Sequence, residues 1–401
     1  MISFGLEEEQ AMIQETVRKF AVENLRPKLR EFEHARALPE SLRRQFHELG
    51  LALVDVPEAL GGQGASLTTA AIVQEELAFG DPGAAIALWS PHLFVQAVLA
   101  LGDEAQQKRF LARFAETAGA LRSGAVAYSE RGAPLDGFNT TAKRSGGDWI
   151  LDGKKAFVVN GGVADLTVVF AQLEGTSGWD GAAAFVVEAG NPGLQAGERH
   201  ALLGLDTVHA AEIVLESCRV PDANRLLGGS NSPKESNFLL GSQRMFARGG
   251  LLNAARQVGL ARAAYEFALD YTQERKAFGK VIAHFQSIAF TLAEMHMDVE
   301  AARWMVWRAA VELEKGKVET VYEAIAHANE AAWRVADNGV QLLGGAGYIR
   351  DYPVEKWMRD TKALALFGPP SECASLAVAA RELGHSFGSG LPSSAIQPFF
   401  T

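Results

Sequence analysis

Two segments of the chain combine charged, aromatic and glycine residues at close spacing, and both are candidates for binding a ligand. The first, Glu274 to Gln286, reads ERKAFGKVIAHFQ and joins two stretches with helical periodicity. The second, Gln341 to Lys362, reads QLLGGAGYIRDYPVEKWMRDTK. Arginine forms charge-assisted hydrogen bonds with anionic groups, and glycine lets the backbone approach a ligand closely. The alternative is a solvated charge at a helix end and glycines that only cap a helix.

Motifs for several other chemistries are missing from the sequence. The nine histidines are scattered, without an HExxH motif or paired Cys and His spacing, so we expect no metal site. Neither a GxSxG nucleophile motif nor a GxxxxGKS phosphate loop occurs. The run Gly344-Gly345-Ala346-Gly347 follows a helical stretch and not a strand, which does not fit a dinucleotide-binding turn.

The elements that must position these segments change in character along the chain. Residues 1–121 show helical periodicity, and Ser66 is a candidate N-cap for one helix. Residues 122–234 contain short apolar runs separated by turn-forming pairs: WILDGKKAFVVN, LTVVFAQL, AAAFVVE and AEIVLE. No long helical pattern interrupts these runs, which favours an antiparallel sheet or barrel over a parallel sheet.

Helices return in residues 235–384, where apolar residues from Phe285 to Val306 are spaced alternately three and four apart. This spacing is typical of a helix packed in a bundle. A second helix is predicted from about Val318 to Leu343, and residues 385–401 form a tail without periodicity. The predicted fold is therefore a multi-domain α+β protein with an N-terminal helical domain, a middle antiparallel β-barrel and a C-terminal four-helix bundle.

Composition restricts the environment and the partners. Among 401 residues, 48 acidic and 38 basic side chains give a net charge of −10, which disfavours binding to nucleic acid or to an acidic membrane. Two cysteines are too few for a disulfide scaffold, and no apolar run approaches the roughly 18 residues that a membrane span needs. We therefore expect a cytoplasmic protein that binds neither nucleic acid nor a membrane.

Together with AYSERGAPLD and GKKAFVVNGG from the strand-rich region, the two segments strongly resemble the acyl-CoA dehydrogenase family. The resemblance extends from Leu6 to about Leu383, in the expected order. It implies the three-domain fold described above, FAD as cofactor and an acyl-CoA thioester as substrate. It also implies an electron-transfer flavoprotein as electron acceptor and a homo- or hetero-oligomer whose subunit interfaces hold the FAD.

In this family, the pyrophosphate and adenine of FAD are bound by the C-terminal domain of a neighbouring subunit. The residues involved are the Arg and Phe of an RKxFG motif, a following Gln and a QxxGG turn. By resemblance, these positions are all retained in the present chain, as Arg275, Phe278, Gln286, Gln341 and Gly345.

The half of the site that normally surrounds the flavin ring is altered. Ser129 retains the hydroxyl expected there, whereas Pro134 and Leu135 replace a glycine and a phosphate-binding serine. In the strand motif that follows, Phe157 replaces tryptophan and Val159 replaces a threonine whose hydroxyl bonds the flavin. One interpretation is drift within a working flavoenzyme, because phenylalanine can still stack on the ring edge. The other is that no flavin ring binds here.

The usual catalytic base is also absent. Removal of the α-proton of a thioester requires a carboxylate within about 3 Å. By resemblance, the commonest glutamate position is Gly368, and the minority position falls in the stretch Arg248-Gly249-Gly250-Leu251. Glu372 is the nearest acidic residue to Gly368 in the sequence and is the remaining candidate for a base, but we expect it to serve as an N-terminal charge at the start of the last helix.

Three hypotheses follow. The leading one is a helper subunit without a base in a hetero-oligomeric acyl-CoA dehydrogenase, in which this chain alone is inactive. The second is a self-sufficient flavoenzyme with other chemistry, such as a monooxygenase or oxidase, or with a base supplied from elsewhere. The third is a non-enzymatic acyl-CoA-binding scaffold without flavin.

Overall fold

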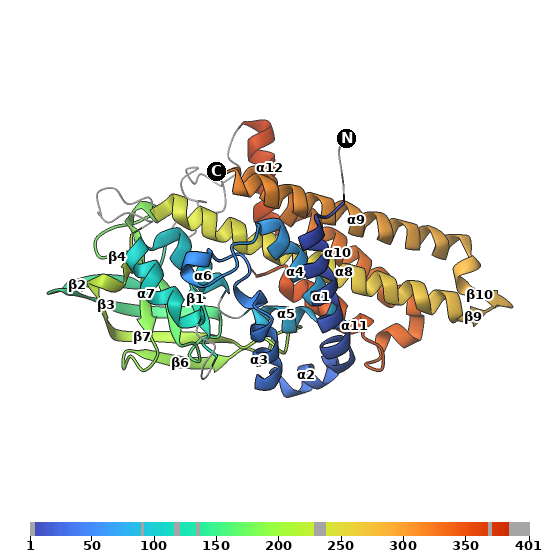
Figure 1. The fold of residues 1–401 in the computed structure, drawn as a ribbon, viewed down its shortest axis with the longest axis horizontal. Helices are drawn as coiled ribbons and strands as arrows, with labels where there is room; N and C mark the ends of the chain where they lie inside the picture. Colours follow the sequence, from blue (N-terminus) through green and yellow to red (C-terminus); the bar gives the residue numbers. More distant parts are fainter. Residues whose placement is uncertain are drawn as a thin grey trace.

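A computed structural model describes residues 5–89, 92–115, 121–133, 137–227, 238–367 and 371–384 of the chain. Figure 1 shows a β-sheet at one end of an elongated molecule and long helices at the other, with the N-terminal helices packed along the middle. Helix α8 (Phe238–Glu274) begins beside the sheet and runs to the opposite end, so it links both ends of the molecule.

The N-terminal part is helical, as predicted. Ser66 caps α4, where its hydroxyl accepts a hydrogen bond from the Thr69 amide at 3.2 Å. Helix α4 is buried on nearly all sides and forms the centre of this part of the protein. The α-helices here are α1 (Glu8–Asn24), α2 (Leu29–Ala35), α3 (Glu40–Glu48), α4 (Leu67–Gly80), α5 (Pro82–Leu88), α6 (His92–Leu101) and α7 (Glu104–Ala115).

The strand-rich region forms an eight-stranded sheet in the order β6-β7-β3-β2-β4-β5-β8, with β1 paired to β4. The four predicted strand segments are found in β3, β4, β5 and β7. The bounds are β1 (Gly124–Ala127), β2 (Thr141–Ser145), β3 (Asp148–Val159), β4 (Leu166–Leu173), β5 (Ala182–Glu188), β6 (Leu194–Arg199), β7 (Ala210–Pro221) and β8 (Arg225–Leu226).

The prediction of a closed antiparallel barrel differs from this sheet in two respects. The pairings of the described strands leave β6 and β8 at its two ends, so the sheet is open. In addition, β1 and β2 both pair with β4 in parallel. They follow one another along β4, with Gly124 opposite Leu166 and Thr141 opposite Gln172. Both strands therefore run in the same direction as β4.

The C-terminal part consists of long helices and a short hairpin at their far end (Figure 1). The predicted spacing is confirmed in α9, where Leu292, Met295, Val299, Ala302 and Val306 are buried. The elements are α8 (Phe238–Glu274), β9 (Lys276–Ala277), β10 (Lys280–Val281), α9 (Gln286–Glu314), α10 (Glu319–Leu343), α11 (Val354–Leu364) and α12 (Ser371–Leu383). Both α11 and α12 pack on α10. The predicted tail, residues 385–401, lies outside the described residues.

Within the described ranges, no single helix combines the length and apolar character needed to cross a membrane, and α5 and α6 meet that test only as a bent pair.

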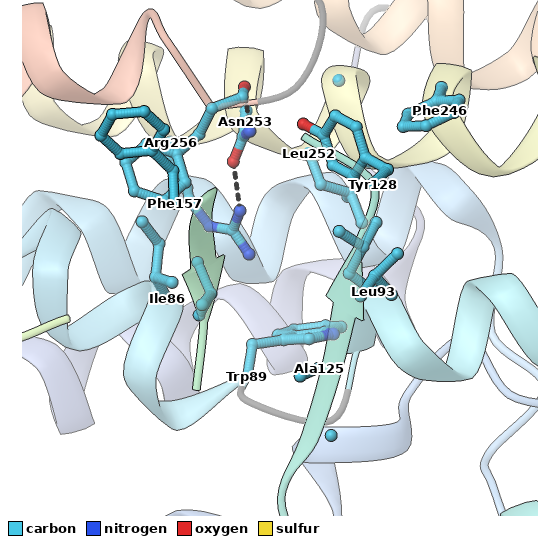
Figure 2. A pocket seen from close by; sticks show the side chains of 16 residues that line it. Ile86, Trp89, Leu93, Ala125, Tyr128, Phe157, Phe246, Leu252, Asn253 and Arg256 are labelled. Atoms are coloured by element: carbon cyan, nitrogen blue, oxygen red, sulfur yellow. Dashed lines mark hydrogen bonds between the residues drawn. The ribbon is translucent and has the colours of Figure 1, made fainter. Parts of the chain in front are cut away.

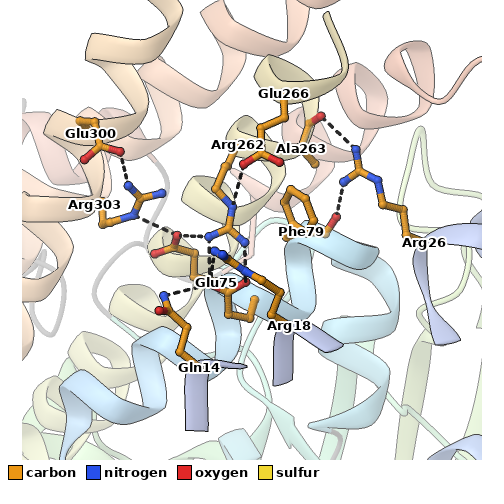
Figure 3. Close-up of polar contacts among 11 residues, drawn as sticks. Gln14, Arg18, Arg26, Glu75, Phe79, Arg262, Ala263, Glu266, Glu300 and Arg303 are labelled. Atoms are coloured by element: carbon orange, nitrogen blue, oxygen red, sulfur yellow. Dashed lines mark hydrogen bonds and ion pairs between the residues drawn. The ribbon is translucent and has the colours of Figure 1, made fainter. Parts of the chain in front are cut away.

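A buried network of charges joins the N-terminal helices to the C-terminal helices (Figure 3). Arg262 of α8 donates to Glu75 at 2.9 Å and to Glu76 at 2.5 Å, both on α4. Arg303 of α9 bonds Glu75 at 3.0 Å, and Arg18 of α1 bonds Glu76 at 3.1 Å. Burial raises the pKa of Glu75, whereas Arg262 and Arg18 outweigh burial at Glu76 and lower its pKa. The network therefore holds four helices together at one place.

Helices α4 and α8 approach so closely at this place that a side chain does not fit between them. A Cβ atom on Gly259 of α8 would lie 2.0 Å from the backbone carbonyl oxygen of Glu75. Backbone atoms cannot move aside as the end of a flexible side chain can, so α4 would have to shift. The absence of a side chain at Gly259 therefore sets the distance between the two helices.

We predict that Gly259→Ala lowers the free energy of unfolding by about 1–3 kcal/mol, the usual cost of overpacking a core. Gly339→Ala in α10 is the matched control, because its Cβ would meet no neighbouring atom closer than 3.7 Å. The control is expected to be neutral or slightly stabilising, because alanine favours a helix over glycine. Urea unfolding of both variants tests this, and equal stabilities would contradict the role of the contact.

Candidate functional site

A cavity of about 110 Å³ lies where the sheet meets α5, α6 and α8 (Figure 2). Its lining side chains are mainly apolar and aromatic, and helix α8 contributes more of them than any other described element. The lining residues are Ile86, Trp89, Leu93, Gly124, Ala125, Val126, Tyr128, Phe157, Val159, Phe246, Gly249, Gly250, Leu252, Asn253, Arg256 and Phe367. None of them is Asp or Glu.

Two polar side chains of α8 lie in this apolar wall. Arg256 donates from Nε to Oε1 of Gln74 on α4 and from Nη1 to Oδ1 of Asn253, each at 2.5 Å. The amide nitrogen of Asn253 in turn donates to the carbonyl oxygen of Phe367 at 2.6 Å. Arg256 is only 8% exposed, and burial lowers its pKa to about 9. The guanidinium therefore remains protonated at neutral pH.

The structure places two of the predicted ring-pocket residues, Phe157 and Val159, in the cavity wall. Phe157 has a positive φ of 54° and is 51% exposed. Its ring lies 4.5 Å from the ring of His200, and its amide donates to Nε2 of His200 at 3.2 Å. A residue other than glycine rarely adopts this backbone conformation. The His200 contacts therefore hold an exposed aromatic ring at the cavity.

The third predicted residue of this pocket, Ser129, lies next to β3 without lining the cavity. Its carbonyl oxygen accepts a hydrogen bond from the Ala156 amide at 2.9 Å. Pro134 and Leu135 lie outside the described residues.

The residue after Ser129, Glu130, forms a buried ion pair with Lys155 of β3. Glu130 accepts from the amides of Asn139 and Thr140, at 2.6 and 3.0 Å, and from Lys155 at 2.5 Å. Burial lowers the pKa of Lys155 to about 8, although Glu130 opposes the shift. Burial acts to raise the pKa of Glu130, but Lys155 and the Thr140 amide hold it below its usual value. The Glu130 carboxylate therefore stabilises the local fold through Lys155 and two backbone amides.

The residues predicted for the neighbour's cofactor lie far from the cavity, at the β9–β10 hairpin (Figure 1). Arg275 directly follows α8 and is exposed, and Gln286 is the first residue of α9. Phe278 is 94% exposed with a φ of 51°, and its ring lies edge-on to Phe285 at 6.3 Å. From Asn253 to Arg275 the helical rise amounts to roughly 33 Å. These side chains cannot reach the cavity of their own chain.

Gln341 and Gly345 lie at the other predicted turn, where α10 ends. Gln341 is exposed in the last turn of α10, and Gly345 follows in a short 3₁₀ helix. A Cβ atom on Gly345 would meet no atom within 4 Å, so the turn faces open space. Both residues are accessible to a ligand from outside the chain.

The three positions considered for a base differ in what the structure describes. Gly249 lines the cavity, so the minority position faces the expected ligand space without a carboxylate. Gly368 lies outside the described residues. Glu372 is in the first turn of α12, as predicted, and its side chain is not among those described.

Sequence reasoning missed Arg256 and Asn253, the polar pair in the cavity wall. The available signal was a single arginine in the run Ala254-Ala255-Arg256-Gln257-Val258 of an apolar helix. A charged residue among small apolar residues indicates burial with a specific partner or ligand.

Three family profiles match almost the entire chain in order. They are the acyl-CoA dehydrogenase N-terminal domain at residues 7–118, the middle domain at 125–218 and the C-terminal domain at 242–383.

Individual relatives agree with these matches. The chain is 33% identical over 367 residues to a probable acyl-CoA dehydrogenase, FadE25, of Mycobacterium leprae, covering 91% of this chain and 92% of the relative. It is 33% identical over 368 residues to cyclohex-1-ene-1-carbonyl-CoA dehydrogenase of Syntrophus aciditrophicus, covering 90% and 87%. Butyryl-CoA dehydrogenase from Megasphaera elsdenii superimposes with a TM-score of 0.87 at 31% identity, covering 95% of this chain and all of that one. Because the three domains of the acyl-CoA dehydrogenase family match in order and relatives are 33% identical over about nine-tenths of the chain, the chain belongs to this family.

Proposed function

We propose that this protein takes part in the α,β-dehydrogenation of acyl-CoA thioesters as a helper subunit that lacks the base. In this proposal, it binds an acyl-CoA thioester and assembles with another acyl-CoA dehydrogenase-like subunit. That subunit supplies the base, and the assembly passes electrons to an electron-transfer flavoprotein.

The observation that carries the proposal is the composition of the cavity wall. The reaction needs a carboxylate next to the α-carbon, and the described wall contains none. Two other described acids are engaged in ion pairs: Glu130 bonds Lys155, and Asp55 accepts from Arg248 at 3.0 Å. A hydrogen bond to the thioester carbonyl would polarise the α-carbon but would not remove its proton.

Members of this family are FAD-dependent, and the residues of this chain fit that cofactor in two places. The half-exposed Phe157 ring beside Val159 offers an apolar surface for a flavin ring. The exposed Arg275, the exposed Phe278 ring and the open turn at Gly345 suit a diphosphate and an adenine. FAD, when bound, supplies the oxidising power for the reaction, and these residues would bind and orient it.

The distance between the two places supports an oligomer. Since the hairpin lies at the end of the molecule away from the sheet, its residues cannot contact a ligand in the cavity of their own chain, but they are open to a ligand held by another subunit (Figure 1). Such an arrangement lets a chain contribute to the cofactor site of its neighbour even when its own cavity lacks a base.

We predict that Arg275→Ala lowers the FAD content of the purified assembly without unfolding it, because a charge-assisted contact with the diphosphate is lost. Lys276→Ala is the control, since Lys276 is an exposed cation on the same hairpin. Flavin absorbance per subunit, native mass and a thermal melt are measured together. Unchanged flavin content in Arg275→Ala would remove the cofactor role of the hairpin.

We further predict that the chain purified alone does not bleach bound flavin when mixed with saturated acyl-CoA thioesters. Gly249→Glu should introduce slow, acyl-CoA-dependent bleaching, because it places a carboxylate in the cavity wall. The nearest atom to the new Cβ is the flexible end of Leu93, at 3.0 Å, so the wall can adjust.

Gly249→Gln is the matched control, with the same shape and no basic group. Bleaching by the unmodified chain would show that a base exists outside the described wall, and would favour the self-sufficient flavoenzyme. A chain that binds no flavin, alone or with a partner subunit, would favour the scaffold.

A further inference from the structure

Arg256 stands apart from the other buried cations of the described residues. Lys155 pairs with Glu130, Lys356 with Asp81 and Asp360, and Arg262 with Glu75 and Glu76. Arg256 is buried to a similar degree, yet no described carboxylate lies within ion-pair distance of it. A buried charge without a counter-charge is strongly unfavourable, so proteins normally pair one with an opposite charge. Among the described residues, Arg256 is therefore a buried cation that could accept an anionic ligand.

The contacts of Arg256 hold its side chain in place without neutralising it. Both of its described hydrogen-bond acceptors, Gln74 and Asn253, are neutral amides. Asn253 is itself oriented by the Phe367 carbonyl, so its oxygen is directed at the guanidinium. The second terminal nitrogen, Nη2, makes no hydrogen bond to a described residue. Figure 2 shows the guanidinium below Asn253, inside the circle of side chains that line the cavity.

From this geometry we propose that the cavity takes an acyl group that ends in a carboxylate, and that Arg256 binds this carboxylate. The inference rests on the proposed function, because it assumes that an acyl-CoA thioester enters the cavity. The apolar wall contributed by Ile86, Leu93, Leu252 and Val159 suits the methylene segment between thioester and carboxylate. Arginine binds carboxylates through paired hydrogen bonds, and burial strengthens such a pair.

Two probes of equal chain length separate this idea from general acyl-CoA binding. Glutaryl-CoA and valeryl-CoA both carry five acyl carbons, and only the first ends in a carboxylate. We expect the protein, in its native assembly, to bind glutaryl-CoA about 10- to 100-fold more tightly than valeryl-CoA, as measured by calorimetry. Adipyl-CoA and hexanoyl-CoA repeat the comparison with one more carbon.

The variant Arg256→Gln should abolish this preference, so that glutaryl-CoA and valeryl-CoA bind the variant with similar affinity. It should also keep or raise the melting temperature, because it removes a buried charge without a partner. Arg262→Gln is the contrasting variant: it breaks the paired network of Figure 3 and should lower the melting temperature without changing the preference.

Equal affinities for the two probes in the unmodified protein would overturn the inference, and this comparison needs no variant. A preference that persists in Arg256→Gln would assign the carboxylate to another cation and overturn it too. Failure to bind either probe would instead count against the proposed function, because no acyl-CoA thioester would then enter the cavity.

Discussion

The contact between α4 and α8 is the constraint on which the rest of the molecule depends. Gly259 lets α8 lie directly against the backbone of Glu75, and three consecutive residues of α4 then meet α8 within hydrogen-bonding distance. Gln74 reaches Arg256 in the cavity wall, while Glu75 and Glu76 reach Arg262 in the charge network. Since α8 also runs beside the sheet, one helix crossing fixes the core, the network and the cavity together.

Much of the fold could be predicted because it depends on local patterns. The spacing from Phe285 to Val306 identified α9, and the Ser66 hydroxyl identified the start of α4. Neither the open ends of the sheet nor the parallel pairing of β1 and β2 with β4 could be predicted, because both depend on which strands meet in the folded chain. A strand's apolar pattern does not specify which neighbour it pairs with or in which direction.

The site was predictable to the extent that it consists of motifs. The motifs led to Phe157 and Val159, which line the cavity, whereas no motif contains Arg256. The position of its guanidinium depends on three residues that meet only in the folded chain: Gln74 on α4, Asn253 on α8 and Phe367 beyond α11. In a sequence, a buried cation without a counter-charge looks the same as one with a partner. Only the folded structure reveals which acids lie nearby.

The β9–β10 hairpin has a consequence for how the protein behaves at different concentrations. Phe278 exposes almost its whole side chain to water, Arg275 is also exposed, and the hairpin forms one end of the molecule. If a ligand bridges this hairpin and the cavity of another subunit, ligand binding and subunit association are linked by mass action. Dilution would then release both the ligand and the neighbouring subunit, and added cofactor would drive reassembly. The amount of holoprotein in a cell would depend on the supply of both chains as well as of the cofactor.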